Sequence, residues 1–223
     1  MAGCNDCASE SATDTERNDP LFRRILWFAL VSNAVMFVVE IIASFTSGSV
    51  SLQADALDFL GDSVNYGISL FVLGMALSAR AKAALFKSAT MAVFGLWVIG
   101  SAIYRAAIGT VPDATTMGVI GLLALLVNVA VAWMLFHFRS GDSNMRSIWL
   151  CSRNDALGNI AVMLAAGGVY ATATGWPDIF VAALVAGLNI SAAIFVLQQA
   201  VAELRSERVF SMEQHQPGAR QEQ

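Results

Sequence analysis

Six long apolar stretches, joined by short polar connections, constrain this 223-residue sequence more than any other feature. They cover residues 22–44, 51–77, 84–107, 114–138, 147–171 and 177–203. A helix needs about 20 mostly apolar residues to cross the hydrocarbon core of a bilayer. We therefore expect an all-α integral membrane protein, built as a six-transmembrane-helix bundle.

The composition supports this expectation and excludes several classes of protein. Hydrophobic residues make up 57% of the chain and charged residues 13%, whereas a soluble domain has about 45–50% and about 25%. Such a chain cannot cover a soluble core with a charged exterior, which argues against a soluble enzyme. The formal net charge of −4 also argues against nucleic acid as a partner.

The basic residues predict how the chain is oriented in the membrane. With the N-terminus inside, and with Arg153 set aside in the fifth stretch, eleven basic residues fall on the cytoplasmic side and only Arg105 falls on the opposite side. The eleven are Arg17, Arg23, Arg24, Arg80, Lys82, Lys87, Arg139, Arg146, Arg205, Arg208 and Arg220. The positive-inside rule then places both termini in the cytoplasm of a multi-pass inner (plasma) membrane protein.

The two polar ends complete the predicted domain organisation. Residues 1–21 are expected to be a disordered cytoplasmic tail, residues 22–205 the six-helix membrane domain, and residues 206–223 a second short disordered tail. The first tail contains a C-x-x-C pair, Cys4 and Cys7. This pair could capture a thiophilic metal ion or be two incidental exposed thiols, because one such pair is weak evidence for a metal site.

Acidic residues inside the apolar stretches predict the functional site. Asp55, Asp58 and Asp62 follow i, i+3, i+7 spacing, which stacks them on one face of a helix. In the fifth stretch, Cys151 and Asp155 have i, i+4 spacing and also share a face. Acidic residues in membrane helices are rare and usually mark a pathway or a binding site. Each helix thus offers a pair of metal ligands one turn apart.

The residue types indicate the chemistry of such a site. Asp58, Asp62, Cys151 and Asp155 could surround a divalent ion such as zinc with four oxygen and sulfur ligands. An empty site of this kind would crowd negative charges, so some of its carboxyl groups should take up protons when the metal leaves. Exchange of metal for protons is the physical basis of an antiporter.

Other interpretations of these residues stay open. The acids could pair helices structurally through Asn, Ser or Arg153, and Cys151 could be a small buried hydrophobe. Asp55 fits a helix terminus or an interface better than a ligand position, and Asp178 fits the first turn of the sixth helix, where the helix dipole favours it. Glu40 could belong to an outer gate or a proton path, or bond to a neighbouring helix.

Several segments together resemble the cation diffusion facilitator family, in its zinc, cobalt and cadmium efflux branch. The resemblance runs from Phe22 to Val209 and is carried by Asn33 with Phe37–Glu40, Ser47–Leu52, Ala54–Ala56, Asn144–Arg146, Cys151–Gly158 and Trp176–Asp178. It implies six helices that bind a divalent metal through H/D-x-x-x-D pairs on the second and fifth spans. It therefore implies Asp58, Asp62, Cys151 and Asp155 as the metal ligands.

This sequence departs from the family pattern in three places. Asp58 and Cys151 stand where the branch usually has His, so the predicted site has no imidazole, and the cytoplasmic C-terminal domain is not present in the sequence. Thiolates favour softer ions and carboxylates harder ones, which leaves zinc, cadmium, cobalt, iron and manganese open. A homodimer would have to be held by the membrane helices.

We therefore expect a transporter rather than an enzyme, with no prosthetic group. Its partners are the bilayer, protons and a divalent metal ion as cargo, with zinc foremost. One alternative is a membrane sensor or accessory protein that binds metal without moving it. Another is a membrane enzyme with a metal-activated water, but the sequence has short loops and no convergent His/Glu pair to support it.

Overall fold

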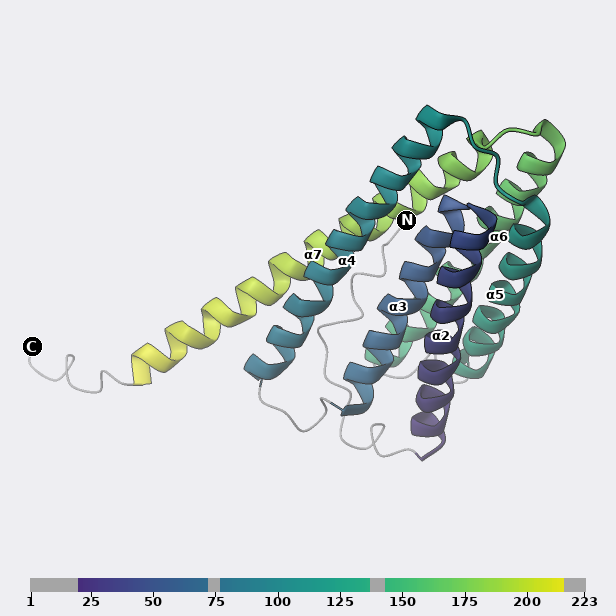
Figure 1. Ribbon diagram of the computed structural model, residues 1–223. Coiled ribbons are helices and arrows are strands. Elements are labelled where there is room, and N and C mark those ends of the chain that lie inside the picture. The colour runs from purple at the N-terminus through teal and green to yellow at the C-terminus, as the bar shows by residue number, and fades with distance from the viewer. Residues whose placement is uncertain (1–19, 72–76, 137–142, 215–223) are drawn as a thin grey trace, which may run out of the picture.

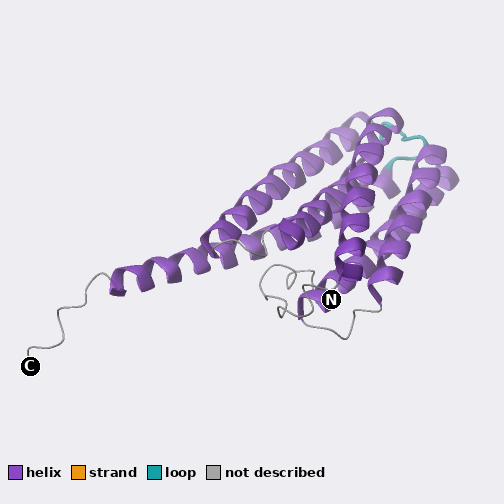
Figure 2. Cartoon of the chain, turned by 90° about the horizontal axis from the view of Figure 1, so that it is seen from below, coloured by secondary structure: helices purple, strands orange, loops and turns teal. Residues whose placement is uncertain are grey.

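The computed structural model describes residues 20–71, 77–136 and 143–214, and these residues form six α-helices and no strand. The helices are α2 (Pro20–Ser47), α3 (Val50–Phe71), α4 (Leu77–Ile108), α5 (Ala114–Leu135), α6 (Ser143–Thr172) and α7 (Trp176–Gln214). The all-helical architecture expected from the sequence is present (Figure 2). Cys4 and Cys7, with the rest of residues 1–19, lie outside the described residues.

The helices pack most extensively as three pairs. They are α2 with α3, α5 with α6, and α4 with α7. In Figure 1 the first two pairs stand side by side, while α4 and α7 run together along the α3 side and α7 extends away from the rest. Helix α3 contacts α2, α4, α6 and α7, so the helix with the three aspartates lies at the centre of the packing.

Three short connections meet at one end of the bundle, which we call the hairpin end. They are the α2–α3 turn at 48–49, the α4–α5 connection at 109–113 and the α6–α7 connection at 173–175. The backbone N–H of Asp113 donates to the carbonyl oxygen of Ser47 at 2.9 Å. A Cβ added to Gly175 would lie 2.5 Å from the carbonyl oxygen of Thr110. Glycine at 175 therefore lets the second and third connections touch.

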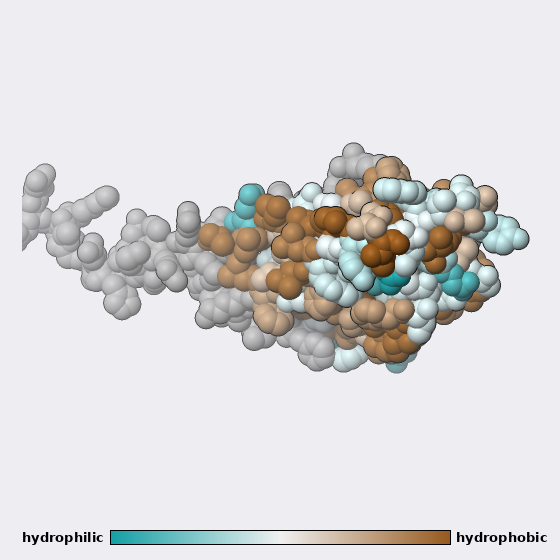
Figure 3. All heavy atoms as spheres, turned by 45° about the horizontal axis from the view of Figure 1, so that its top comes forward, coloured by the Kyte–Doolittle hydropathy of each residue, from teal (hydrophilic) through white to brown (hydrophobic). Residues whose placement is uncertain are grey.

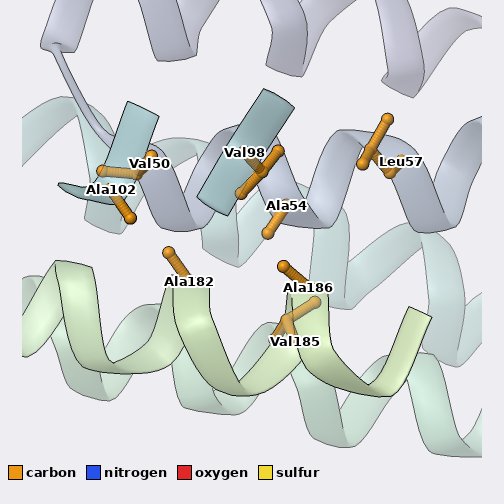
Figure 4. Close-up of a cluster of buried hydrophobic side chains, with 8 residues drawn as sticks. All are labelled: Val50, Ala54, Leu57, Val98, Ala102, Ala182, Val185 and Ala186. Atoms are coloured by element: carbon orange, nitrogen blue, oxygen red, sulfur yellow. The ribbon is translucent and has the colours of Figure 1, made fainter. Parts of the chain in front are cut away.

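Small side chains hold α3, α4 and α7 close together. One buried cluster joins these three helices, as Figure 4 shows, and half of its eight residues are alanine. The cluster consists of Val50, Ala54, Leu57, Val98, Ala102, Ala182, Val185 and Ala186. Small residues let helix backbones approach closely, and this close packing replaces the hydrophobic driving force that is missing between helices in lipid.

The surface and the interior have the polarity expected of a membrane protein. Large apolar side chains are exposed, among them Trp133 at 78% and Tyr170 at 83%, while Glu40 and Asn159 are fully buried. Figure 3 shows hydrophobic side chains in brown over much of the visible face. Soluble proteins rarely expose apolar area so widely.

Three described segments are long and apolar enough to cross a bilayer. They are Pro20–Ser47, Ser88–Ile108 and Ala114–Leu135, and Trp176–Ser191 is a shorter apolar segment. Helices α3 and α6 are not among them, and these two helices contain Asp58, Asp62 and Asp155. The polar residues that predict a site thus lower the hydropathy of its helices, and the six-span count stays a prediction.

Helix α7 is longer than the sequence predicted. We expected a disordered tail from residue 206, but α7 continues to Gln214. Residues 201–214 contain three Glu and two Arg, with one each of Ala, Leu, Met and Gln, and all of these have high helix propensity. At 39 residues the helix is about 58 Å long, well beyond the about 30 Å of a hydrocarbon core.

Candidate metal site between helices α3 and α6

The first turn of α3 fixes the orientation of the acidic face. The Ser49 hydroxyl accepts a hydrogen bond from the Leu52 N–H at 3.1 Å, as an N-cap residue does. Asp178 of α7 accepts three more: from the Ser49 hydroxyl (2.7 Å), the Val50 N–H (2.8 Å) and the Ser51 N–H (3.0 Å). A buried carboxylate of one helix therefore anchors the start of another.

Asp178 lies where the sequence predicted, in the first turn of α7. Sequence analysis missed its second role at the N-terminus of α3, which begins 128 residues earlier in the chain. The carboxylate is 1% exposed and lies near two helix N-termini, where the helix dipoles favour negative charge. The fixed start of α3 sets the direction in which Asp55, Asp58 and Asp62 project.

The three aspartates of α3 differ in their exposure. Asp55 is buried, whereas Asp58 and Asp62 are half-buried. Their spacing places them along one face of α3, and Asp58 interacts electrostatically with both Asp55 and Asp62. The face therefore concentrates negative charge that a cation or protons would neutralise.

Tyr66 connects the acidic face of α3 to α6. Its hydroxyl donates to Asp62 Oδ2 at 3.2 Å and forms a second hydrogen bond, at 2.8 Å, with the Ser152 hydroxyl of α6. Ser152 lies one position after Cys151 and three before Asp155. Tyr66 also interacts electrostatically with Asp155, so its hydroxyl lies near an aspartate of each helix, Asp62 of α3 and Asp155 of α6.

The structure gives the helix of each predicted ligand and, for three of the four, the burial of its side chain. Asp58 and Asp62 lie on α3, Asp155 is half-buried on α6, and Cys151 belongs to α6 while its side chain lies outside the described set. Among the side chains that the structure describes, no three His, Cys, Asp or Glu groups converge closely enough to hold a metal ion. The complete Asp58, Asp62, Cys151 and Asp155 site stays a prediction.

Sequence analysis also missed three polar neighbours of the predicted ligands. They are Tyr66, Ser152 and Asn189, the last of which lies on α7 beside the carboxyl group of Asp58. The signal for Tyr66 was its i+4 spacing from Asp62, which continues the acidic face by one turn. Asn189 could not be found in this way because it belongs to a different helix.

Two further polar contacts lie between helices. Asn128 of α5 donates to Asn159 of α6 at 3.5 Å, an interhelical hydrogen bond between two buried side chains. Glu40 of α2 lies beside Asp55 of α3. The neighbour of Glu40 is thus another acid, and among the described residues no basic group pairs with Glu40.

At the hairpin end, Asp113 caps α5. Its carboxylate accepts hydrogen bonds from the Thr116 hydroxyl and from the Thr116 N–H, the latter at 2.8 Å. These bonds, the hydroxyl first, lower the pKa of Asp113 below its ordinary value because they stabilise the charged form. Asp113 is exposed and serves below as a control for the buried carboxylates.

Comparison with known proteins shows the family of this chain. The family model of the cation efflux transmembrane domain matches residues 26–205, which covers most of the chain and every predicted ligand. The chain belongs to the cation efflux family. The resemblance inferred from its motifs is thereby confirmed, and the family is one of transporters rather than of enzymes.

Curated relatives of this cation efflux protein carry the names of metal transporters. The cadmium, cobalt and zinc/H(+)-K(+) antiporter of Bacillus subtilis is 27% identical over 198 residues, which are 78% of this chain and 62% of the relative. The zinc transporter ZitB of Escherichia coli is 26% identical over 211 residues, or 88% of this chain and 67% of the relative. The metal cation efflux system protein CzcD of Cupriavidus metallidurans is 25% identical over 165 residues, 69% of this chain and 52% of CzcD. The chain thus spans about 62% of the Bacillus relative.

Proposed function

We propose that this protein exports a divalent transition-metal ion, zinc foremost, from the cytoplasm in exchange for protons. The observation that carries the proposal is the double hydrogen bond of Tyr66, which joins Asp62 of α3 to Ser152 of α6. It supports a site shared by the two helices that contain the predicted ligand pairs. The names of the relatives, which include zinc, cadmium and cobalt, agree with this cargo.

Four residues bind the metal in this proposal. Asp58 and Asp62 contribute from α3, and Cys151 and Asp155 contribute from α6. Three carboxylates and a thiolate can replace the hydration shell of a divalent ion, and a thiolate favours zinc, cadmium or cobalt over harder ions. When the ion leaves, protons neutralise the remaining charge, which couples the two fluxes.

The surrounding assembly is part of the same proposal. All six helices span the inner membrane, with both termini cytoplasmic, and the bundle rocks around a site near the midplane, as secondary transporters commonly do. The exposed apolar faces of the helices would contact lipid and a second copy of the chain in a homodimer.

Transport in proteoliposomes tests the proposal. Purified protein is reconstituted with a pH-sensitive dye inside the vesicles and challenged in turn with zinc, cadmium, cobalt, manganese and iron. We expect metal-dependent proton movement, which is lost in Asp62→Ala and in the Asp62→Ala, Asp155→Ala double variant. Asp113→Asn, which changes an exposed carboxylate at the hairpin end, should transport like the wild type.

Two results would contradict the proposal. Transport that persists in the double variant would exclude Asp62 and Asp155 as essential ligands. Tight metal binding without proton movement for any of the five ions would instead support a membrane sensor or accessory protein.

A further inference from the structure

Two buried carboxyl groups lie side by side between α2 and α3. Glu40 is 0% exposed and Asp55 is 1% exposed, and their side chains are neighbours. Glu40 is seven residues from the end of α2 and Asp55 is five residues from the start of α3. Both therefore lie on the hairpin-end side of Asp58 and Asp62.

Three carboxyl oxygens of Glu40 and Asp55 lack a hydrogen-bond donor among the described groups. Among the described groups, neither Glu40 oxygen has a hydrogen-bond partner, and the same is true of Asp55 Oδ2. Ionised carboxylates can only accept hydrogen bonds, and buried acceptors without donors are rare in folded proteins. A proton on either group would turn it into a donor and satisfy an oxygen of the other. One shared proton would thus give a hydrogen bond to two of these three oxygens.

Neighbouring helices bring further negative charge close to Glu40 and Asp55, and among the described residues no basic side chain pairs with either of them. Asp58 is one turn from Asp55 and acts electrostatically on Glu40. Helix α5 contains no ionisable residue between 114 and 135, and Asp178 of α7 accepts its bonds from residues 49–51. The other ionisable residues with described side chains on the helices packed against α3 are Arg23 and Arg24 on α2, Tyr104 and Arg105 on α4, and Arg153, Asp155 and Tyr170 on α6. Arg23 and Arg24 lie near the start of α2, and Glu40 lies near its other end. Arg105 lies against Gly48 at the hairpin end.

We propose that Glu40 and Asp55 form a proton-binding site that is separate from the metal site. The occupied pair holds one proton and one negative charge. It releases the proton to water and becomes two carboxylates, and uptake of a proton from water reverses the step. Two adjacent carboxylates repel each other strongly in a medium of low dielectric constant, which is why the empty pair is the less stable form.

The role of this site rests on the proposed transport function. A divalent ion at Asp58 and Asp62 would neutralise the charge that repels the pair from one turn away. The pair could then release its proton more easily, so that binding of metal favours release of a proton. Coupling of this kind is reciprocal: protonation of the pair would weaken metal binding by the same factor.

Glu40→Gln tests the proposal because glutamine has nearly the same shape and supplies an amide donor to Asp55 without a titrating proton. Protons released on binding of Zn²⁺ to the purified protein are counted by calorimetry in buffers of different ionisation enthalpy. We expect Glu40→Gln to bind Zn²⁺ within a few-fold of the wild type and to release about one proton fewer per ion. Asp113→Asn should release the wild-type number.

A second measurement does not depend on transport or on metal. Infrared spectroscopy of the metal-free wild type at neutral pH should show the carbonyl band of protonated carboxylic acids, and Glu40→Gln should lower the intensity of this band by the contribution of about one acid. Asp55→Asn provides a second variant in case Glu40→Gln does not fold. If the wild type binds no metal but its band is lowered in Glu40→Gln, the proposed function fails and the proton site stands.

Three outcomes would overturn the proton site. One is an unchanged proton count in Glu40→Gln. Another is a loss of Zn²⁺ affinity in Glu40→Gln as large as that in Asp62→Asn, which would make Glu40 part of the metal site. The third is a protonated-carboxyl band that is absent in the wild type or has the same intensity in Glu40→Gln.

Discussion

Removal of the Asp178 carboxylate should destabilise the bundle strongly, because this one group joins α7 to α3. It accepts hydrogen bonds from the Ser49 hydroxyl and from the N–H groups of Val50 and Ser51, and it is 1% exposed. The Ser49 hydroxyl has an alternative partner in the Ser51 hydroxyl, 3.3 Å away. In Asp178→Ala, two backbone N–H groups are then left without an acceptor.

The magnitude follows from these two N–H groups. A buried donor that loses its partner costs about 1–3 kcal/mol, so Asp178→Ala should lower the free energy of unfolding by about 2–6 kcal/mol. Asp178→Asn retains one carbonyl oxygen, which can still accept from the Ser51 N–H. Its amide group would face the Val50 N–H, so the loss should be about half as large.

Unfolding by SDS in mixed micelles measures both variants. Asp113→Asn is the matched control, because Asp113 also caps a helix but is exposed, and its carboxylate bonds to Thr116 within the same turn. Asparagine is as good an N-cap as aspartate, so the control should unfold like the wild type at neutral pH. Equal stability of Asp178→Ala and the wild type would refute the anchoring role of this carboxylate.

Three further predictions concern other parts of the structure. Tyr66→Phe removes the hydroxyl that holds Asp62 to Ser152. Because Asp62 would no longer have to break this bond to reach a metal ion, the zinc affinity measured by equilibrium dialysis should rise, while transport should slow. Unchanged affinity and transport would contradict the contact. Gly48 has a φ of +74°, and a Cβ there would lie 2.6 Å from Arg105. Gly48→Ala should therefore lower the free energy of unfolding in the SDS assay by about 1–2 kcal/mol through the left-handed backbone alone. An unchanged free energy of unfolding would argue against this turn. The pKa of Asp113 is lowered in the folded state, so its carboxylate stabilises that state at pH values above the ordinary aspartate pKa, and this contribution is lost as the pH falls through the lowered pKa. The stability of Asp113→Asn against unfolding should therefore depend less on acid pH than that of the wild type. An identical pH dependence would contradict the capping role of this carboxylate.

The helical architecture could be predicted because it depends on local patterns. Long apolar stretches predict α2 and α5 to within a few residues, since the bilayer sets their length. The end of α7 could not be predicted from apolarity, because helix propensity carries the helix on through polar residues 206–214. A hydropathy pattern locates the part of a helix that suits lipid and not the part that extends beyond it.

The sequence predicts which residues of the candidate site share a face of one helix, but not which residues of different helices contact one another. The spacing of Asp58 and Asp62 places them on one face of α3, and the spacing of Cys151 and Asp155 does the same for α6. The partners of these residues depend on contacts between helices. Neither the bond between Tyr66 and Ser152 nor the position of Asn189 beside Asp58 follows from sequence spacing.

The buried acids illustrate the same limit. From the sequence, Glu40 is an unusual intramembrane acid, and Asp55 fits a helix terminus or an interface. Packing of α2 against α3 brings the two carboxyl groups together. A proton shared between them would supply the hydrogen-bond donor that they lack. Asp178 was assigned to the dipole of its own helix, but its hydrogen bonds go to another helix as well.

A double-mutant cycle on zinc binding tests most directly whether α3 and α6 bind the same metal ion. The affinity for Zn²⁺ is measured by equilibrium dialysis for the wild type, Asp62→Asn, Asp155→Asn and the double variant. If both carboxylates bind one ion, each single variant should lose most of the affinity, and the double variant should lose much less than the two losses added together. Losses that add fully would mean that Asp62 and Asp155 act independently, and would contradict a site shared between the two helices.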